Sequence, residues 1–330
     1  MSSGKINNGK GNVRMKKGIV ITPEDFNGVD WFAKMKELHL NTLGIHSGGG
    51  ASHDVLQVLG DFGGEEFRKR TALAGLDLEY EIHAANSLLD RSLFQRNSAL
   101  FPYNSTAGKR TENGNWCISN PETGKLLGEN AVALSEKLIP STHRHYFWSC
   151  DFPGGWCHCS TCAQMNASDQ NLASVNIMAE AVRRRDPEAK MAYLAYLNHY
   201  EIPESVTPAE GVFLEFAPMT RCSRHAINDR KCAVNRIYWE SLKRHLTLFD
   251  PAETHILEYW LDVSYYSHYR KPAVRPLLFR DILRYDIEAY MSLGIRSFST
   301  FAVYMDGEYF KHNGDDELCI YADVLREFDS

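Results

Sequence analysis

Short apolar runs alternate with longer amphipathic stretches along most of the chain. Several of the runs have the length and the β-branched or aromatic content that are typical of strands. The eight predicted strands are residues 18–22, 41–46, 76–85, 145–150, 189–198, 212–217, 255–261 and 295–305. Between them, apolar residues recur at helical spacing over residues 29–39, 52–74, 123–138, 169–185, 229–248 and 282–291, and again from residue 315. The alternation predicts successive β-α-β units with parallel strands.

Eight such units are the number that closes a parallel barrel. We therefore predict an α/β fold, a single (β/α)8 TIM barrel with extended βα loops over residues 18–330. The alternative is an open doubly wound sheet, but the glycine-rich phosphate turns GxGxxG and GxxxxGK[ST] are absent, and no hairpin signal interrupts the alternation. Residues 1–17 are rich in Gly, Asn and Lys without apolar periodicity, which predicts a disordered N-terminal segment.

Polar and aromatic residues gather where the predicted strands end, which in a barrel is the face that carries catalysis. A long segment over residues 91–119 adds to this face, because loops of such length in compact domains are usually functional. Aromatic residues make up 12% of the chain, and flat aromatic side chains suit sugar binding, although they are also ordinary core residues. The predicted substrate-binding residues are His46, His83, Asn86, Arg110, Trp116, Trp148, Tyr196, His199, Arg221, His225, Trp260 and Tyr304.

Three carboxylates at these strand ends are the predicted catalytic residues. Glu215 and Glu258 lie within apolar runs, where a charge is costly unless it is paired or functional. Asp151 ends the fourth strand, and glycoside hydrolysis needs two carboxyl groups across one bond. We expect Asp151 and Glu258 to face each other across the barrel mouth, with Glu215 as an alternative base. The structural alternatives are a buried ion pair for Glu215 and a turn-forming role for Asp151.

The most specific local pattern is a cluster of thiols directly after Asp151. Cys157, Cys159 and Cys162 fall within six residues, and Cys222, His225 and Cys232 follow the sixth strand. Thiolates at such spacing are natural zinc ligands, with a fourth ligand expected from Cys222, His225 or Cys232. A structural zinc would brace the loop, and no cofactor is required for the reaction. Buried free thiols, or disulfides in an exported protein, are the alternatives.

Charge and hydropathy limit which classes of binding partner and which cellular compartment we expect. The formal net charge of −6 disfavours nucleic acid and anionic membranes as partners. The short basic run over residues 183–185 is typical of a solvated helix end. No apolar run approaches the ~18 residues of a membrane span, and the N-terminus lacks the pattern of a signal peptide. We therefore expect a cytoplasmic protein whose eight cysteines are reduced or metal-bound.

These motifs carry a family resemblance. The stretch WSCDFPGGWCHCSTCA over residues 148–163, the EFAPMTRC stretch over 215–222 and the LEYW stretch over 257–260 resemble the domain-of-unknown-function family 4838. Members of that family are glycoside-hydrolase-like TIM barrels found mainly in bacteria. The resemblance implies a sugar-directed site. Retaining barrels of the main glycosidase clan place Glu on strands four and seven, whereas this chain has Asp151 on strand four. Phe152 follows it, so the adjacent Asp-Glu pair of substrate-assisted hexosaminidases is missing.

Three functions follow in order of preference. The first is a glycoside hydrolase that acts on a carbohydrate through paired carboxylates. The second is a metal-dependent sugar isomerase or hydrolase, in which Glu215, Glu258, Asp151 and a histidine would bind a hard divalent ion. The third is a carbohydrate-binding barrel without catalysis.

Overall fold

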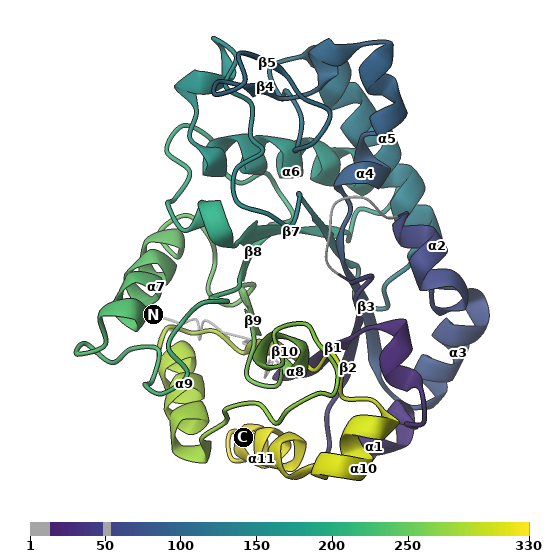
Figure 1. Ribbon diagram of the computed structural model, residues 1–330, viewed down its shortest axis with the longest axis vertical. Helices are drawn as coiled ribbons and strands as arrows, with labels where there is room; N and C mark the ends of the chain where they lie inside the picture. Colours follow the sequence, from purple (N-terminus) through teal and green to yellow (C-terminus); the bar gives the residue numbers. More distant parts are fainter. Residues whose placement is uncertain (1–13, 49–53, 330) are drawn as a thin grey trace, which may run out of the picture.

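The computed structural model describes residues 14–48 and 54–329. Eight parallel strands close into a barrel, with helices around it, which confirms the predicted fold. Figure 1 looks down the barrel. In their order around the barrel, the strands are β1 (Lys16–Ile21), β2 (Thr42–Ile45), β3 (Asp77–His83), β6 (Arg144–Trp148), β7 (Lys190–Ala195), β8 (Val212–Phe216), β9 (His255–Glu258) and β10 (Ser297–Phe301).

The longer helices follow the predicted amphipathic stretches, whereas the short helices Ala85–Leu88, Val263–Tyr266 and Gly307–Asn313 were not predicted. Asn120 caps the helix predicted to start there, because its side chain accepts a hydrogen bond from the backbone of Glu122, and Pro121 fits the first turn. The stretch over 52–74 is split at its glycines into two short helices and a 3-10 turn between them. The helices are α1 (Trp31–Glu37), α2 (Val55–Leu59), α3 (Glu65–Leu73), α4 (Ala85–Leu88), α5 (Pro121–Lys137), α6 (Ala167–Arg183), α7 (Ala233–His245), α8 (Val263–Tyr266), α9 (Arg280–Ser292), α10 (Gly307–Asn313) and α11 (Asp316–Arg326).

Two sequence predictions need correction. Strand β1 begins at Lys16, so the barrel starts before the predicted boundary at residue 18. The rest of the predicted N-terminal segment, residues 1–13, lies outside the described residues. The long loop over 91–119 contains a hairpin that the pattern did not predict, formed by β4 (Tyr103–Asn104) and β5 (Lys109–Arg110). Two-residue strands are too short to show an alternating pattern.

The strands separate two apolar layers. Inside the barrel, one cluster of buried side chains includes Val20, Trp148, Phe213 and Leu257. Outside it, a larger cluster fills the space between the barrel and the helices. Because successive side chains of a strand point to opposite faces, each strand contributes to both layers.

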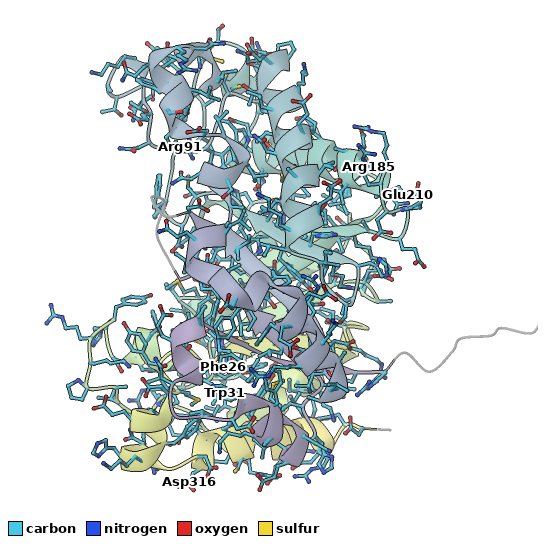
Figure 2. The ribbon with its side chains drawn as sticks, turned by 90° about the vertical axis from the view of Figure 1, so that its right-hand side faces the viewer. Phe26, Trp31, Arg91, Arg185, Glu210 and Asp316 are labelled. Carbon is cyan, nitrogen blue, oxygen red and sulfur yellow. The ribbon has the colours of Figure 1, made fainter. Side chains whose placement is uncertain are left out.

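The two ends of the barrel differ in their connections. Figure 2 views the molecule from the side, with Arg91, from the long loop after β3, toward one face. Arg185 and Glu210, which precede β7 and β8, lie toward the opposite face. The hairpin β4–β5 lies beyond α6, away from the barrel axis (Figure 1). In the described part of the chain, each helix is too short or too polar to cross a bilayer.

Candidate active site at the barrel mouth

A cavity of about 500 Å³ opens where the strands end. Its lining comes from the segments after most of the barrel strands, as expected for the catalytic face of a TIM barrel. Five of the residues predicted for the site meet here, namely Asp151, His46, His83, Tyr196 and Tyr304. The barrel therefore gathers residues from five separate stretches of sequence into one cavity.

Asp151 follows β6 and is held by neighbours from two other strands. The hydroxyl of Tyr196 donates a hydrogen bond to its Oδ1 at 3.2 Å. Nε2 of His83 lies 3.4 Å from the same oxygen, and Nδ1 of that ring lies 2.7 Å from the carbonyl oxygen of Ser149. The Asp151 side chain keeps 25% of its surface exposed, so it is both oriented and accessible.

A second carboxyl group, Asp262, lines the same cavity after β9. Sequence reasoning missed it, although it directly follows the predicted seventh strand, where a strand-end carboxylate could have been sought. Burial raises the pKa of Asp262 to about 6, against hydrogen bonds from Ser264 and Tyr265 that lower it. Its Oδ1 accepts those hydrogen bonds at 2.6 Å and 3.1 Å, which also makes it the N-cap of α8.

Asp151 and Asp262 influence the same aromatic side chain. Burial raises the pKa of Tyr269 to about 12, and the negative charges of Asp262 and Asp151 add to the shift. Further lining residues missed by sequence reasoning include Tyr259, Phe301 and Lys271. The cavity thus combines four carboxyl groups, those of Glu24, Asp25, Asp151 and Asp262, with aromatic walls and the cation of Lys271. Apolar surface with a small set of placed polar groups is typical of ligand sites.

Glu215 lies inside the barrel and does not line the mouth. Its neighbours Leu214 and Phe216 belong to the outer core, so strand alternation turns Glu215 inward. There it accepts a hydrogen bond at 2.7 Å from Nε1 of Trp148. Burial, together with the charge of Glu81, holds the pKa of Glu215 well above its usual range.

Glu258 points in the opposite direction, toward the helices. Leu257 belongs to the interior cluster, so the next side chain faces outward. The Tyr290 hydroxyl of α9 donates a hydrogen bond to Glu258 at 2.6 Å, and Nε of Arg221 lies 3.4 Å from its other oxygen. Burial raises the pKa of Glu258 to about 7. The structure therefore does not place Glu258 opposite Asp151 in the mouth cavity.

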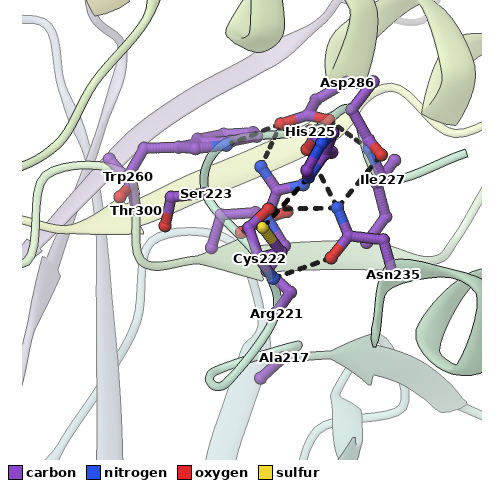
Figure 3. A network of polar contacts seen from close by, with 12 residues as sticks. Ala217, Arg221, Cys222, Ser223, His225, Ile227, Asn235, Trp260, Asp286 and Thr300 are labelled. Atoms are coloured by element: carbon purple, nitrogen blue, oxygen red, sulfur yellow. Dashed lines mark hydrogen bonds and ion pairs between the residues drawn. The ribbon is translucent and has the colours of Figure 1, made fainter. Parts of the chain in front are cut away.

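Arg221 and Trp260 belong to this same outer network (Figure 3). The guanidinium of Arg221 binds both carboxylate oxygens of Asp286, and Trp260 donates to the same carboxylate at 3.1 Å. Asp286 also accepts a hydrogen bond from the backbone of Ile227 at 2.6 Å. The network ties the loop after β8 to α9 and β9.

The other predicted binding residues lie outside the lining of the cavity. Trp116 is buried and donates to Ser174 at 2.6 Å. His199 is buried against Trp156, with ring centroids 5.3 Å apart. The Oδ1 atom of Asn86 accepts a hydrogen bond from Arg91 at 2.7 Å. The remaining three are Trp148 in the barrel interior, Arg110 on the hairpin and His225 in a loop.

The predicted metal ligands separate into two groups. Cys157, Cys159 and Cys162 lie with Cys117 of the long loop, whereas Cys222 and Cys232 lie with His225. The residue that joins the first group is therefore Cys117 of the long loop, and the prediction of Cys222, His225 or Cys232 as its fourth member was wrong. Local spacing does not reveal a partner so far away in the sequence. Asp151, Glu215 and Glu258, proposed together for a hard divalent ion, lie in three different environments.

The closed barrel of eight parallel strands, with its cavity at the ends of the strands, defines a (β/α)8 TIM barrel. The profile of the family described as Domain of unknown function (DUF4838) matches residues 65–294, more than half of the chain. The chain therefore belongs to that family, as the motifs predicted.

Solved structures agree on the fold. The cold-adapted beta-galactosidase from Rahnella sp. R3 superposes with a TM-score of 0.58 at 12% identity, over 96% of this chain and 56% of that one. The beta-galactosidase from the psychrophilic Marinomonas ef1 gives 0.53 at 11% identity, over 95% and 59%. This chain thus spans less than two thirds of either enzyme. A search among curated proteins gives no match.

Proposed function

We propose that the protein hydrolyses a glycosidic bond at the barrel mouth, with Asp151 and Asp262 as the reacting carboxyl groups. The observation that carries the proposal is their placement in one cavity, after the fourth and the seventh barrel strands. This pair replaces the pair of Asp151 and Glu258 expected from the sequence. The similarity of the fold to beta-galactosidases supports the same class of reaction.

The environments of the two groups suggest different roles. Burial raises the pKa of Asp262 to about 6, so this group keeps its proton in weakly acidic solution and can give it to the leaving oxygen. Asp151 is oriented by Tyr196 and His83 and is the group that attacks the anomeric carbon or activates water. Tyr259 and Phe301 supply apolar surface for a sugar ring.

The test is hydrolysis of a panel of aryl glycosides that covers several sugars in both anomeric forms. We expect Asp151→Asn and Asp262→Asn each to lower kcat/KM by about 10²-fold or more, because acid–base groups contribute 10²–10⁴-fold. The matched control is Asp30→Asn, which alters another N-cap aspartate away from the cavity and should keep full activity. Full activity in both site variants would exclude the assignment.

The pH profile gives an independent readout. A general acid works only while protonated, so kcat/KM should decline as the pH rises through about 6, the pKa of Asp262. With an activated aryl leaving group, Asp262→Asn should lose this alkaline limb while a residual rate persists. Tight glycan binding in calorimetry without turnover on any panel member would instead favour a carbohydrate-binding barrel.

A further inference from the structure

Four cysteine sulfurs converge beside the β4–β5 hairpin. The sulfurs of Cys117, Cys157, Cys159 and Cys162 all lie within 4.8 Å of one another. Cys117 Sγ lies 3.7 Å from that of Cys159 and 3.9 Å from that of Cys162. A disulfide would need about 2.0 Å, and all eight cysteines of the chain are free thiols. The separations are instead those of a coordination shell.

Tetrahedral geometry makes this comparison quantitative. With zinc–sulfur bonds of about 2.3 Å, the edges of a tetrahedral four-thiolate site measure about 3.8 Å. The two separations from Cys117 bracket that length. Three of the sulfurs belong to buried residues and the fourth, that of Cys159, to a half-buried one, so the shell is closed to solvent on most sides. Closed four-coordinate shells are typical of structural zinc.

The surroundings provide hydrogen bonds for thiolates. The backbone amides of Tyr103 and Cys159 donate to Cys157 Sγ at 3.4 Å and 3.5 Å. The hydroxyl of Ser119 lies 3.4 Å from Cys117 Sγ and 3.5 Å from Cys159 Sγ, and the guanidinium of Arg110 lies 3.9 Å from Cys157 Sγ. Donors and a cation around the sulfurs compensate the excess negative charge of four thiolates on one divalent ion.

The apolar support at this place is small. Cys117, Cys157 and Cys162 form a buried cluster of their own, separate from both layers of the barrel. The cluster joins two loops that follow β3 and β6. These loops also meet through the rings of Trp116 and Trp156, with centroids 6.3 Å apart, and through hydrogen bonds such as His158 N to Tyr103 O at 2.9 Å. A metal would fasten the two loops together.

We propose that Cys117, Cys157, Cys159 and Cys162 bind one zinc ion that fixes the loop after β3 to the loop after β6. Asp151 stands at the start of the second loop, so the ion also holds the backbone that carries it. The proposal does not depend on the reaction at the mouth. The ion has four protein ligands and leaves no position for water, so its role is structural.

Zinc content can be measured on the full chain, purified without chelators from zinc-supplemented medium. Elemental analysis should show that Cys117→Ser and Cys159→Ser each carry one zinc equivalent less than the parent chain. Cys319→Ser, on α11 and outside both thiol groups, should keep the parent content. Because each variant is compared with the parent chain, an ion bound at Cys222, His225 and Cys232 would cancel from the difference in zinc content.

If the serine variants do not fold, the test uses the parent chain with its zinc exchanged for cobalt. Cobalt bound to four thiolates in a tetrahedron gives intense visible and thiolate-to-metal charge-transfer bands. Three results would overturn the proposal: no zinc in the parent chain, iron in its place, or fewer than eight reactive thiols in the denatured, unreduced protein. The last result would show that the cysteines form disulfides.

Discussion

At the residue scale, Glu81 of β3 is a buried carboxyl group without a hydrogen-bond partner in the described part of the chain. Gly44 makes room for it, since a Cβ there would lie 2.8 Å from Glu81 Oε1. Burial raises the pKa of Glu81 from 4.5 to about 8, against the charge of Lys16, which lowers it. At neutral pH the group therefore keeps its proton.

This shift predicts how stability depends on pH. The folded-state pKa of Glu81 lies above its unfolded-state value. Its contribution to the free energy of unfolding is therefore fully present below pH 4.5 and is lost as the pH rises through about 8. Glu81 alone makes the free energy of unfolding fall by at most about 1.4 kcal/mol per pH unit in that window. Urea unfolding at pH 5.5 and 8 should show a smaller difference for Glu81→Gln than for the parent chain. An unchanged difference would contradict this account, and Glu65→Gln on the surface is the control.

Part of the candidate site could be predicted from polar residues at the ends of the predicted strands. Asp151, His83 and Tyr196 were found because polar residues at the ends of apolar runs meet at the mouth of a barrel. Glu215 and Glu258 were placed at the mouth because buried charges suggest function, but strand alternation sends one into the barrel and the other toward α9. Asp262 directly follows the predicted seventh strand and could have been sought there, although β9 itself ends at Glu258.

At the element scale, the ion pair between Arg221 and Asp286 joins the loop after β8 to α9. Both side chains are buried, and Glu258 provides a second carboxyl group beside the same guanidinium. Replacing Asp286 by Asn removes a charge partner and leaves Arg221 without its bidentate acceptor. We expect a loss of about 3–5 kcal/mol in the free energy of unfolding, as for other broken buried pairs.

Chemical denaturation measures this loss against a control on the same helix. Glu288 forms an exposed pair with Arg284, four residues earlier. Exposed pairs contribute about 0–1 kcal/mol, so Glu288→Gln should unfold almost like the parent chain. Equal stabilities for the Asp286 and Glu288 variants would show that the network does not hold the loop on α9.

The sequence predicted elements well where hydrophobic periodicity is long. Helices α5 and α6 carry an apolar stripe over several turns and an asparagine cap, so their positions followed from pattern alone. The β4–β5 hairpin did not, because it contains only two pairs of residues. It contacts the loop after β6, for example through the hydrogen bond from His158 N to Tyr103 O, and contacts between segments so distant in the sequence leave no local signal.

At the scale of the whole molecule, the protein consists of a barrel and an extension, formed by the loops after β3 and β6, that shares only part of the main core. The main apolar cluster reaches the extension through Phe101, Trp116 and Trp156, whereas the part around the four thiols has only a small cluster of its own. Stability is therefore unevenly distributed. Regions with few buried apolar contacts open locally at a free energy well below that of global unfolding.

Removing the proposed zinc should expose this difference. Under reducing conditions with a strong chelator, amide hydrogen exchange should accelerate over residues 101–119 and 150–165, while peptides from β8 and β10 keep their protection. Metal binding stabilises only the state that holds the ligands together, so its loss lowers the local opening free energy and leaves the barrel intact. Returning zinc should restore protection in the parent chain but not in Cys117→Ser. Equal exchange in both loops with and without chelator would mean that the backbone hydrogen bonds between the loops, such as Asn115 N to Gly155 O at 2.8 Å, are sufficient to hold the extension on the barrel.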